Sequence, residues 1–131
     1  MALRRVGFFR ELRHGDRSGP SIKEAVRQSP WQDEDRLLDY LKSGNLFVAS
    51  PGVSDDVLDP AKTRVTPFHL YTDGEWIWPY DLVYYIENYH VVVPPEFIEH
   101  ASEMGWKPPE LSRDDLIRLE EEILRERNPT S

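Results

Sequence analysis

Cysteine is absent from the 131 residues of the chain. Its absence excludes disulfides, thiol nucleophiles and thiolate metal ligands together, and it makes a reducing cytoplasm the expected compartment. A run of about 18 apolar residues is also missing, so the sequence predicts no membrane span. The N-terminal segment breaks its apolar residues with charge every few positions and lacks the continuous apolar core of a signal peptide.

Motifs that carry common chemistry are missing too. The chain has no phosphate-binding loop, no G-x-G-x-x-G and no G-x-S-x-G. Its four histidines include no pair at helical ligand spacing and no H-E-x-x-H. We therefore predict no catalytic residues, no metal site and no cofactor, and we favour a protein without enzymatic activity.

Basic residues are outnumbered, with 16 Lys and Arg against 24 Asp and Glu, for a formal net charge of −8 and a pI near 5.0. The imbalance is uneven, because residues 1–27 carry a net charge of +4 and residues 28–131 a net charge of −12. An acidic body disfavours nucleic acid, which is bound by neutralising phosphates, and suits a basic protein partner. The alternative is that the acidity only keeps the protein soluble.

Aromatic residues concentrate in the stretch 66–93, which holds two of the four Trp and five of the six Tyr. Asp73-Gly74 is a hairpin signal, because Gly supplies the positive φ of a tight turn. Trp76 and Trp78 then alternate with Ile77 and share one face of a strand. Pro79 ends this strand, and a helical apolar stripe follows at positions Leu82, Tyr85, Ile86 and Tyr89.

The fold class predicted is a single α+β domain over residues 1–131. Its small antiparallel sheet contains the 67–78 hairpin, which feeds an amphipathic helix, and a third strand at 46–49. Four or five helices cover the sheet; one short helix begins after a capping box formed by Ser21 and Glu24. The others span 33–43, 80–89, 95–104 and 112–126. Residues 1–19 are predicted to form a basic N-terminal arm. Residues 53–66 are predicted to form a connection with one helical turn near 54–58. Residues 107–111 form a Pro-rich link to a C-terminal helix predicted at 112–127.

An outward surface of tyrosines and acids is the predicted site for a basic protein partner. The helical period of residues 80–89 places some of their aromatic side chains away from the core. Tyr is enriched at protein interfaces. The competing interpretation is simple amphipathic packing. The predicted contact set, which includes the acidic loop at 53–60, is Asp55, Asp56, Asp59, Tyr80, Asp81, Tyr84 and Glu87.

Two other functions stay open. A small-molecule-binding protein or small enzyme would use a pocket near the 67–78 hairpin, with His69, Asp73, Trp76 and His90 beside it. Each of these residues also has a structural explanation, since Asp73 for instance is a turn residue. A homo-oligomeric structural protein would instead use the 112–127 helix as the seam of a homodimer.

The pattern D-G-x-W-x-W-P-x-D-L, at Asp73 to Leu82, resembles a family of small uncharacterised actinobacterial proteins. YLKSG at 40–44, SPGVSDDVLDP at 50–60 and VPPEFIEHASEMGW at 93–106 extend the resemblance over about half of the chain. The resemblance implies a bacterial protein and carries no functional residues. Acidic proteins of this size in such genomes are often immunity proteins, and this analogy suggests an inhibitor of a basic toxin or effector.

Overall fold

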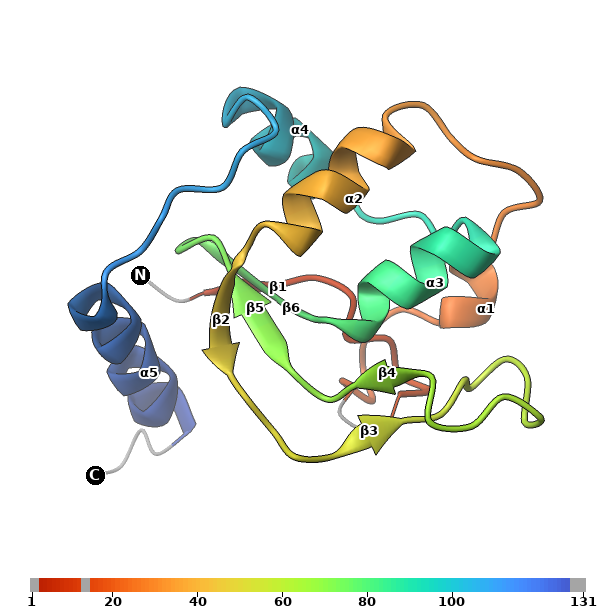
Figure 1. Ribbon diagram of the computed structural model, residues 1–131, viewed down its shortest axis with the longest axis horizontal. Helices are drawn as coiled ribbons and strands as arrows, with labels where there is room; N and C mark the ends of the chain where they lie inside the picture. Colours follow the sequence, from red (N-terminus) through yellow and green to blue (C-terminus); the bar gives the residue numbers. More distant parts are fainter. Residues whose placement is uncertain (1–2, 13–14, 128–131) are drawn as a thin grey trace.

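A computed structural model describes residues 3–12 and 15–127, and Figure 1 shows how their helices and strands are arranged. A four-stranded sheet lies at the centre, with a separate two-stranded sheet beside it. Along the chain the elements are β1 (Arg4–Arg5), α1 (Ile22–Ala25), α2 (Glu34–Lys42), β2 (Asn45–Val48), β3 (Val53–Ser54), β4 (Thr66–Pro67), β5 (Leu70–Thr72), β6 (Trp76–Pro79), α3 (Asp81–Tyr89), α4 (Pro95–Glu103) and α5 (Arg113–Arg127).

The predicted hairpin is the centre of the larger sheet. β5 and β6 pair antiparallel with Tyr71 opposite Trp78, and Gly74 in the turn has a φ of +100°. β2 pairs antiparallel with β5, which confirms the predicted third strand. The sheet is mixed, because β1 adds to the other side of β6 in parallel, giving the order β1-β6-β5-β2.

The two faces of β6 bury different parts of the chain. Trp76 and Trp78 join the main core, where helices α2, α3 and α4 cover one face of the sheet. Ile77 points to the opposite face, where Leu119 and Ile123 of α5 pack against it in a smaller cluster. Successive residues of a strand point to opposite faces, so one short segment organises both layers. The α+β class is confirmed.

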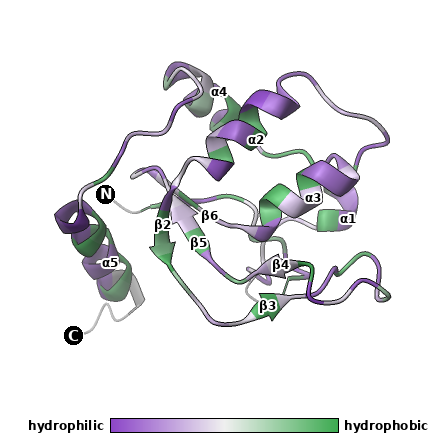
Figure 2. Ribbon diagram, viewed as in Figure 1, coloured by the Kyte–Doolittle hydropathy of each residue, from purple (hydrophilic) through white to green (hydrophobic). Residues whose placement is uncertain are grey.

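The four long helices begin and end close to their predicted positions. Figure 2 shows hydrophobic and hydrophilic residues interspersed along α2, α3 and α5, as expected of helices with one buried stripe. α5 docks on the sheet, although Ile117 and Leu124 remain 43% and 51% exposed. Its pairing with a second copy stays a prediction.

Side-chain capping is present at α5, and at α1 it departs from the prediction. Ser112 and Asp115 form the reciprocal capping box of α5, at 3.1 Å in each direction. At α1 the Ser21 side chain does not cap the helix. It donates instead to Glu11, whose other carboxylate oxygen accepts the Ile22 N–H at 2.8 Å. A tertiary contact therefore replaces the predicted local one.

The structure corrects the prediction for the connection at 53–66 and shows how the N-terminal arm packs. The helical turn predicted near 54–58 is wrong, because β3 pairs with β4 there and turns follow. In the N-terminal arm Phe8, Phe9 and Leu12 are buried, so the arm is part of the domain; residues 1–2 and 13–14 lie outside the described ranges. Within those ranges no helix is both long and apolar enough to cross a membrane.

Candidate functional site

The hairpin turn carries a buried carboxylate at the junction of three elements. Asp73 follows β5 directly, and its Oδ1 accepts the backbone N–H groups of Glu75 at 2.9 Å and Trp76 at 2.7 Å. Asp in a turn commonly accepts hydrogen bonds from N–H groups two or three residues ahead. Its Oδ2 accepts the hydroxyl of Tyr40 from α2 at 2.6 Å. This carboxylate therefore ties the hairpin to α2 as well as closing the turn.

His100 of α4 joins the same carboxylate to the surface. Its Nε2 lies 2.9 Å from Asp73 Oδ2, and its Nδ1 lies 3.2 Å from Glu75 Oε2. A neutral imidazole has one N–H, so both contacts are hydrogen bonds donated by the ring only when it is protonated. The Asp73 side chain is wholly buried and that of Glu75 is 65% exposed. The imidazole thus links a buried carboxylate to an exposed one.

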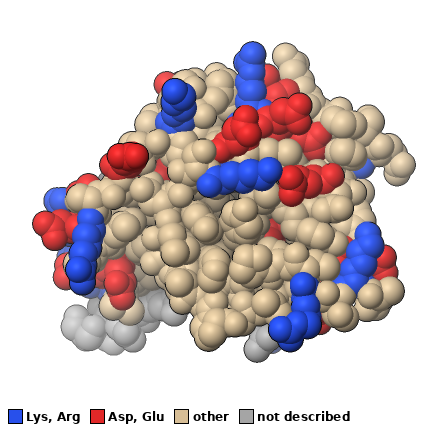
Figure 3. All heavy atoms as spheres, viewed as in Figure 1, with Lys and Arg blue, Asp and Glu red and all other residues tan. Residues whose placement is uncertain are grey.

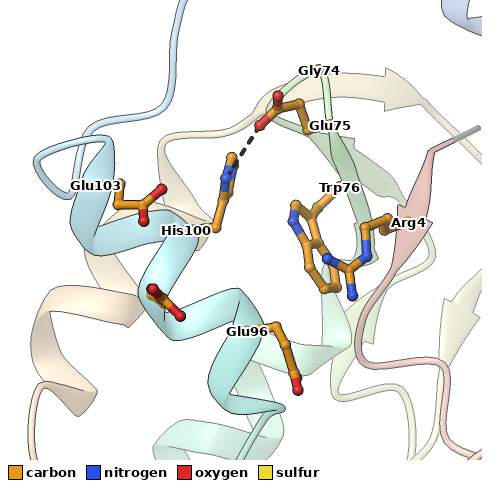
Figure 4. A pocket seen from close by; sticks show the side chains of 8 residues that line it. Arg4, Gly74, Glu75, Trp76, Glu96, His100 and Glu103 are labelled. Atoms are coloured by element: carbon orange, nitrogen blue, oxygen red, sulfur yellow. Dashed lines mark ion pairs between the residues drawn. The ribbon is translucent and has the colours of Figure 1, made fainter. Parts of the chain in front are cut away.

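A hollow of about 480 Å³ opens beside this histidine. Glu96, Glu99, His100 and Glu103 reach it from α4, because spacings of three, four and seven residues place side chains on one face of a helix. Figure 4 shows the hairpin and Trp76 facing α4 across it, with Arg4 beside the indole. We call it the acidic pocket, and its lining is Arg4, Gly74, Glu75, Trp76, Glu96, Glu99, His100 and Glu103.

The charges around the acidic pocket are unbalanced. Four of its eight lining residues are Glu, and Arg4 is its one Lys or Arg. The Arg4 guanidinium carbon lies 4.2 Å from the centroid of the Trp76 ring, a cation–π contact. Among the described residues, no Lys or Arg forms an ion pair with any of the four glutamates. The pocket therefore keeps a local excess of negative charge that a cationic group would relieve.

Asp56 is the centre of a second hydrogen-bond network, in the predicted acidic loop. It is 3% exposed, and its Oδ2 accepts the hydroxyls of Tyr84 at 2.8 Å and Tyr89 at 2.6 Å. Its Oδ1 accepts the backbone N–H groups of Leu58 at 2.7 Å and Asp59 at 3.0 Å. The two tyrosine bonds hold the loop against α3, and the two backbone bonds close a turn within the loop, so the carboxylate is part of the interior.

These contacts change the acidities of the groups that make them. Burial opposes ionisation of Asp56, but the hydrogen bonds from Tyr89, Tyr84 and the backbone outweigh it and hold the pKa of this carboxyl below its usual value. Burial and the hydrogen bond to Asp56 raise the pKa of Tyr84 to about 12. The same hydrogen bond and burial raise the pKa of Tyr89. The network thus favours an ionised carboxylate with neutral tyrosines.

The predicted outward face of α3 is wrong in part. Asp81 is 2% exposed and lies inside, and the Tyr84 hydroxyl bonds to Asp56. The loop at 53–64 covers a second side of α3, which the helical period of α3 alone does not reveal. Tyr80 is half-buried, with its ring 5.1 Å from that of Tyr71.

The remaining acids of the predicted contact set have local partners. Glu87 is exposed and pairs with Lys42 at 3.1 Å. Asp59 is partly exposed and lies 4.0 Å from Lys62. Asp55 is exposed and accepts the Arg64 N–H at 2.8 Å. Figure 3 shows this mixture on one face, where acidic side chains over α2 and α3 lie among basic ones.

The structure brings together two of the four residues of the predicted alternative pocket. Trp76 lines the acidic pocket, and Asp73 lies behind it in contact with His100. His69 is elsewhere, where its Nδ1 accepts the Ser50 N–H at 3.2 Å. His90 is also elsewhere, because its Nδ1 lies 2.9 Å from Glu34 of α2.

Sequence reasoning missed the contribution of α4 to the site. The signal was present, since Glu96, Glu99, His100 and Glu103 fall on one face of a helix that was predicted. Arg4 gives no such signal, because its place depends on the pairing of β1 with β6. In the part of the chain that the structure describes, no group of three or more His, Cys, Asp and Glu is arranged to hold a metal ion.

Comparison with protein-family models, with curated proteins and with solved structures finds no match for this chain. The family resemblance of the segment from Asp73 to Leu82 therefore stays a prediction. What the protein does has to be inferred from the geometry and charge of the acidic pocket.

Proposed function

We propose that this protein is a non-enzymatic binding module for a basic protein partner, and that the acidic pocket is its principal contact site. The observation that carries the proposal is the absence of any Lys or Arg ion pair, among the described residues, at the four pocket glutamates. Carboxylates that form no ion pair with a Lys or Arg of their own chain gain more when a partner supplies a cation.

The acidic pocket suits this role better than the loop and helix surface predicted from the sequence. Glu87 and Asp59 already lie beside Lys42 and Lys62, so a partner's cation would compete with these lysines. Glu96, Glu99 and Glu103 form no ion pair with a Lys or Arg of the described chain and stand exposed on α4. The exposed residues of the contact set predicted from the sequence form a secondary contact area for the same partner.

The concrete form of the proposal is an immunity-type inhibitor in a bacterial cytoplasm, whose acidic surface masks a basic site on a toxin or effector. Opposite charges on two partners raise the rate of encounter by about 10- to 1,000-fold at low salt. They also discriminate against acidic competitors, because like charges repel across an interface. Speed and selectivity are the properties that an inhibitor of a harmful protein requires.

The test is a tagged capture from a lysate of the source organism at low and at moderate salt. The variant E96Q/E99Q/E103Q removes three charges from the pocket. E24Q/E110Q/E121Q removes three exposed charges elsewhere and serves as the matched control. We expect a stoichiometric basic protein that the pocket variant loses at lower salt than the wild type and the control do. Equal retention by both variants would place the contact outside the pocket and contradict the proposal.

A second candidate function is a small-molecule-binding protein or small enzyme, and the contact between Asp73 and His100 favours it. A buried carboxylate that orients an imidazole at the edge of a pocket is a geometry on which general bases are built. A screen of cationic metabolites by thermal shift tests this alternative. We would then expect a ligand that stabilises the wild type and leaves His100→Gln unchanged; if none raises the melting temperature, this candidate fails.

A further inference from the structure

The N-terminal strand places a cation of the protein's own in the acidic pocket. Arg4 belongs to β1, and its guanidinium carbon lies 4.2 Å from the Trp76 ring centroid. The indole is 4% exposed, with Phe97 also in ring contact with it at 5.0 Å. Figure 4 shows the Arg4 side chain beside the indole, on the side away from His100. The guanidinium thus occupies the position at which an incoming cation would meet an aromatic surface.

The strand that carries Arg4 is short and lies at an edge of the sheet. Among the residues that the structure describes, β1 has two residues and pairs with β6 alone. The Arg4 N–H donates to Glu75 O at 3.0 Å, and the Val6 N–H donates to Ile77 O at 3.1 Å. These backbone bonds hold the strand while the long Arg4 side chain extends into the pocket. The side chain can therefore leave the indole by rotation about its own bonds, without release of the strand.

The contact between Arg4 and Trp76 is weak enough to be exchanged. A cation–π contact near the surface changes an equilibrium by about two- to five-fold. No ion pair from Arg4 to a carboxylate adds to it among the described residues. A partner that offers several cations to the four glutamates would gain more than this contact loses.

We infer that Arg4 is an autoinhibitory occupant of the acidic pocket, which a basic partner displaces when a guanidinium or ammonium group takes its place. This inference rests on the proposed function and adds a competition within the protein to it. It predicts that removal of Arg4 improves binding of basic ligands. The adjacent residue Arg5 provides the control, because its guanidinium lies over Phe8, 5.6 Å from that ring.

The experiment measures binding of a hexa-arginine amide peptide to the full chain by calorimetry at low salt. Arg4→Gln and Arg5→Gln each remove one positive charge from neighbouring positions, so their long-range effects on a cationic peptide are similar. We expect Arg4→Gln to bind the peptide about two- to five-fold more tightly than Arg5→Gln does. Arg4→Lys, which keeps the charge but loses the planar guanidinium, should show a smaller gain over the wild type. Circular dichroism of each variant confirms that it is folded.

The outcomes separate this inference from the proposed function. If the wild type binds the peptide, E96Q/E99Q/E103Q weakens that binding, and Arg4→Gln equals Arg5→Gln, then the acidic pocket stands and the role of Arg4 is refuted. If the triple variant binds as the wild type does, or if the wild type does not bind, both ideas fail together. Tighter binding by Arg4→Gln alone supports the inference.

Discussion

Replacement of Asp73 by alanine removes the acceptor that joins the hairpin turn to α2 and α4. The carboxylate lies in contact with four donors: two backbone N–H groups, the Tyr40 hydroxyl and the His100 imidazole. The variant leaves the buried hydroxyl and the imidazole without this partner. Each buried donor left without its acceptor costs about 1–3 kcal/mol, so loss of an acceptor shared by several donors costs about 3–5 kcal/mol in all. We expect Asp73→Ala to lower the free energy of unfolding by that amount, out of a total of about 5–15 kcal/mol for a domain.

A conservative variant separates the turn from the charge. Asp73→Asn keeps an oxygen that can accept the two backbone N–H groups, but it replaces the charged acceptor that faces Tyr40 and His100 with an amide. A hydrogen bond to a charged group is worth about 1.5–3 kcal/mol. The loss for Asp73→Asn should therefore be smaller than that for Asp73→Ala, at about 1–3 kcal/mol.

Urea unfolding followed by tryptophan fluorescence and by circular dichroism measures both losses. Asp39→Ala is the control, because Asp39 is an exposed aspartate on α2 and its replacement should change stability by no more than about 0.5 kcal/mol. A loss below about 1 kcal/mol for Asp73→Ala would refute the reasoning, since it would mean that the four contacts contribute little to the folded state.

Two further predictions concern the pH dependence of the Asp56 network and the close packing of Gly44 against Trp78. Because the pKa of Tyr84 is raised to about 12, from about 10 in an unfolded chain, the associated stability is present below about pH 10 and is lost as the pH rises toward 12. The lowered pKa of Asp56 gives stability that is present above its unfolded pKa of about 3.9 and is lost as the pH falls through the folded value. Absorbance of tyrosinate near 295 nm should show the delayed alkaline titration, and Asp56→Asn should shorten the delay; an unchanged curve would contradict the network. For Gly44→Ala, the added Cβ would lie 2.5 Å from an aromatic carbon of Trp78, so we expect a loss of about 1–3 kcal/mol. Gly52→Ala meets only ordinary contacts at 3.8 Å and should lose clearly less in the same urea assay; equal losses would show that the Trp78 contact is not the cause.

Burial of acidic side chains explains where the predicted contact set fails. Asp56 and Asp81 read as solvent-exposed from their surroundings in the sequence, and both lie inside. The loop that carries Asp56 is held against α3 by bonds between residues 28 and 33 positions apart, from Asp56 to Tyr84 and Tyr89. Helical periodicity shows which side of α3 is apolar, but it does not show that a distant polar loop covers another side.

The sequence by itself determined the local architecture of this protein. Asp73-Gly74 predicted the turn, alternation placed Trp76 and Trp78 opposite Ile77, and apolar stripes predicted the four long helices. These features depend on backbone preferences and on periods of two and 3.6 residues, which act over a few neighbouring positions. The fold class could be predicted for that reason.

Only the tertiary structure decided the candidate site. The acidic pocket forms where the turn at Asp73 meets His100, 27 residues further along the chain, and where parallel pairing of β1 with β6 brings Arg4 to Trp76. Tyr40 completes the buried network from 33 residues away. Such contacts depend on how elements pack in space, and no local pattern of spacing or composition specifies which residues will meet.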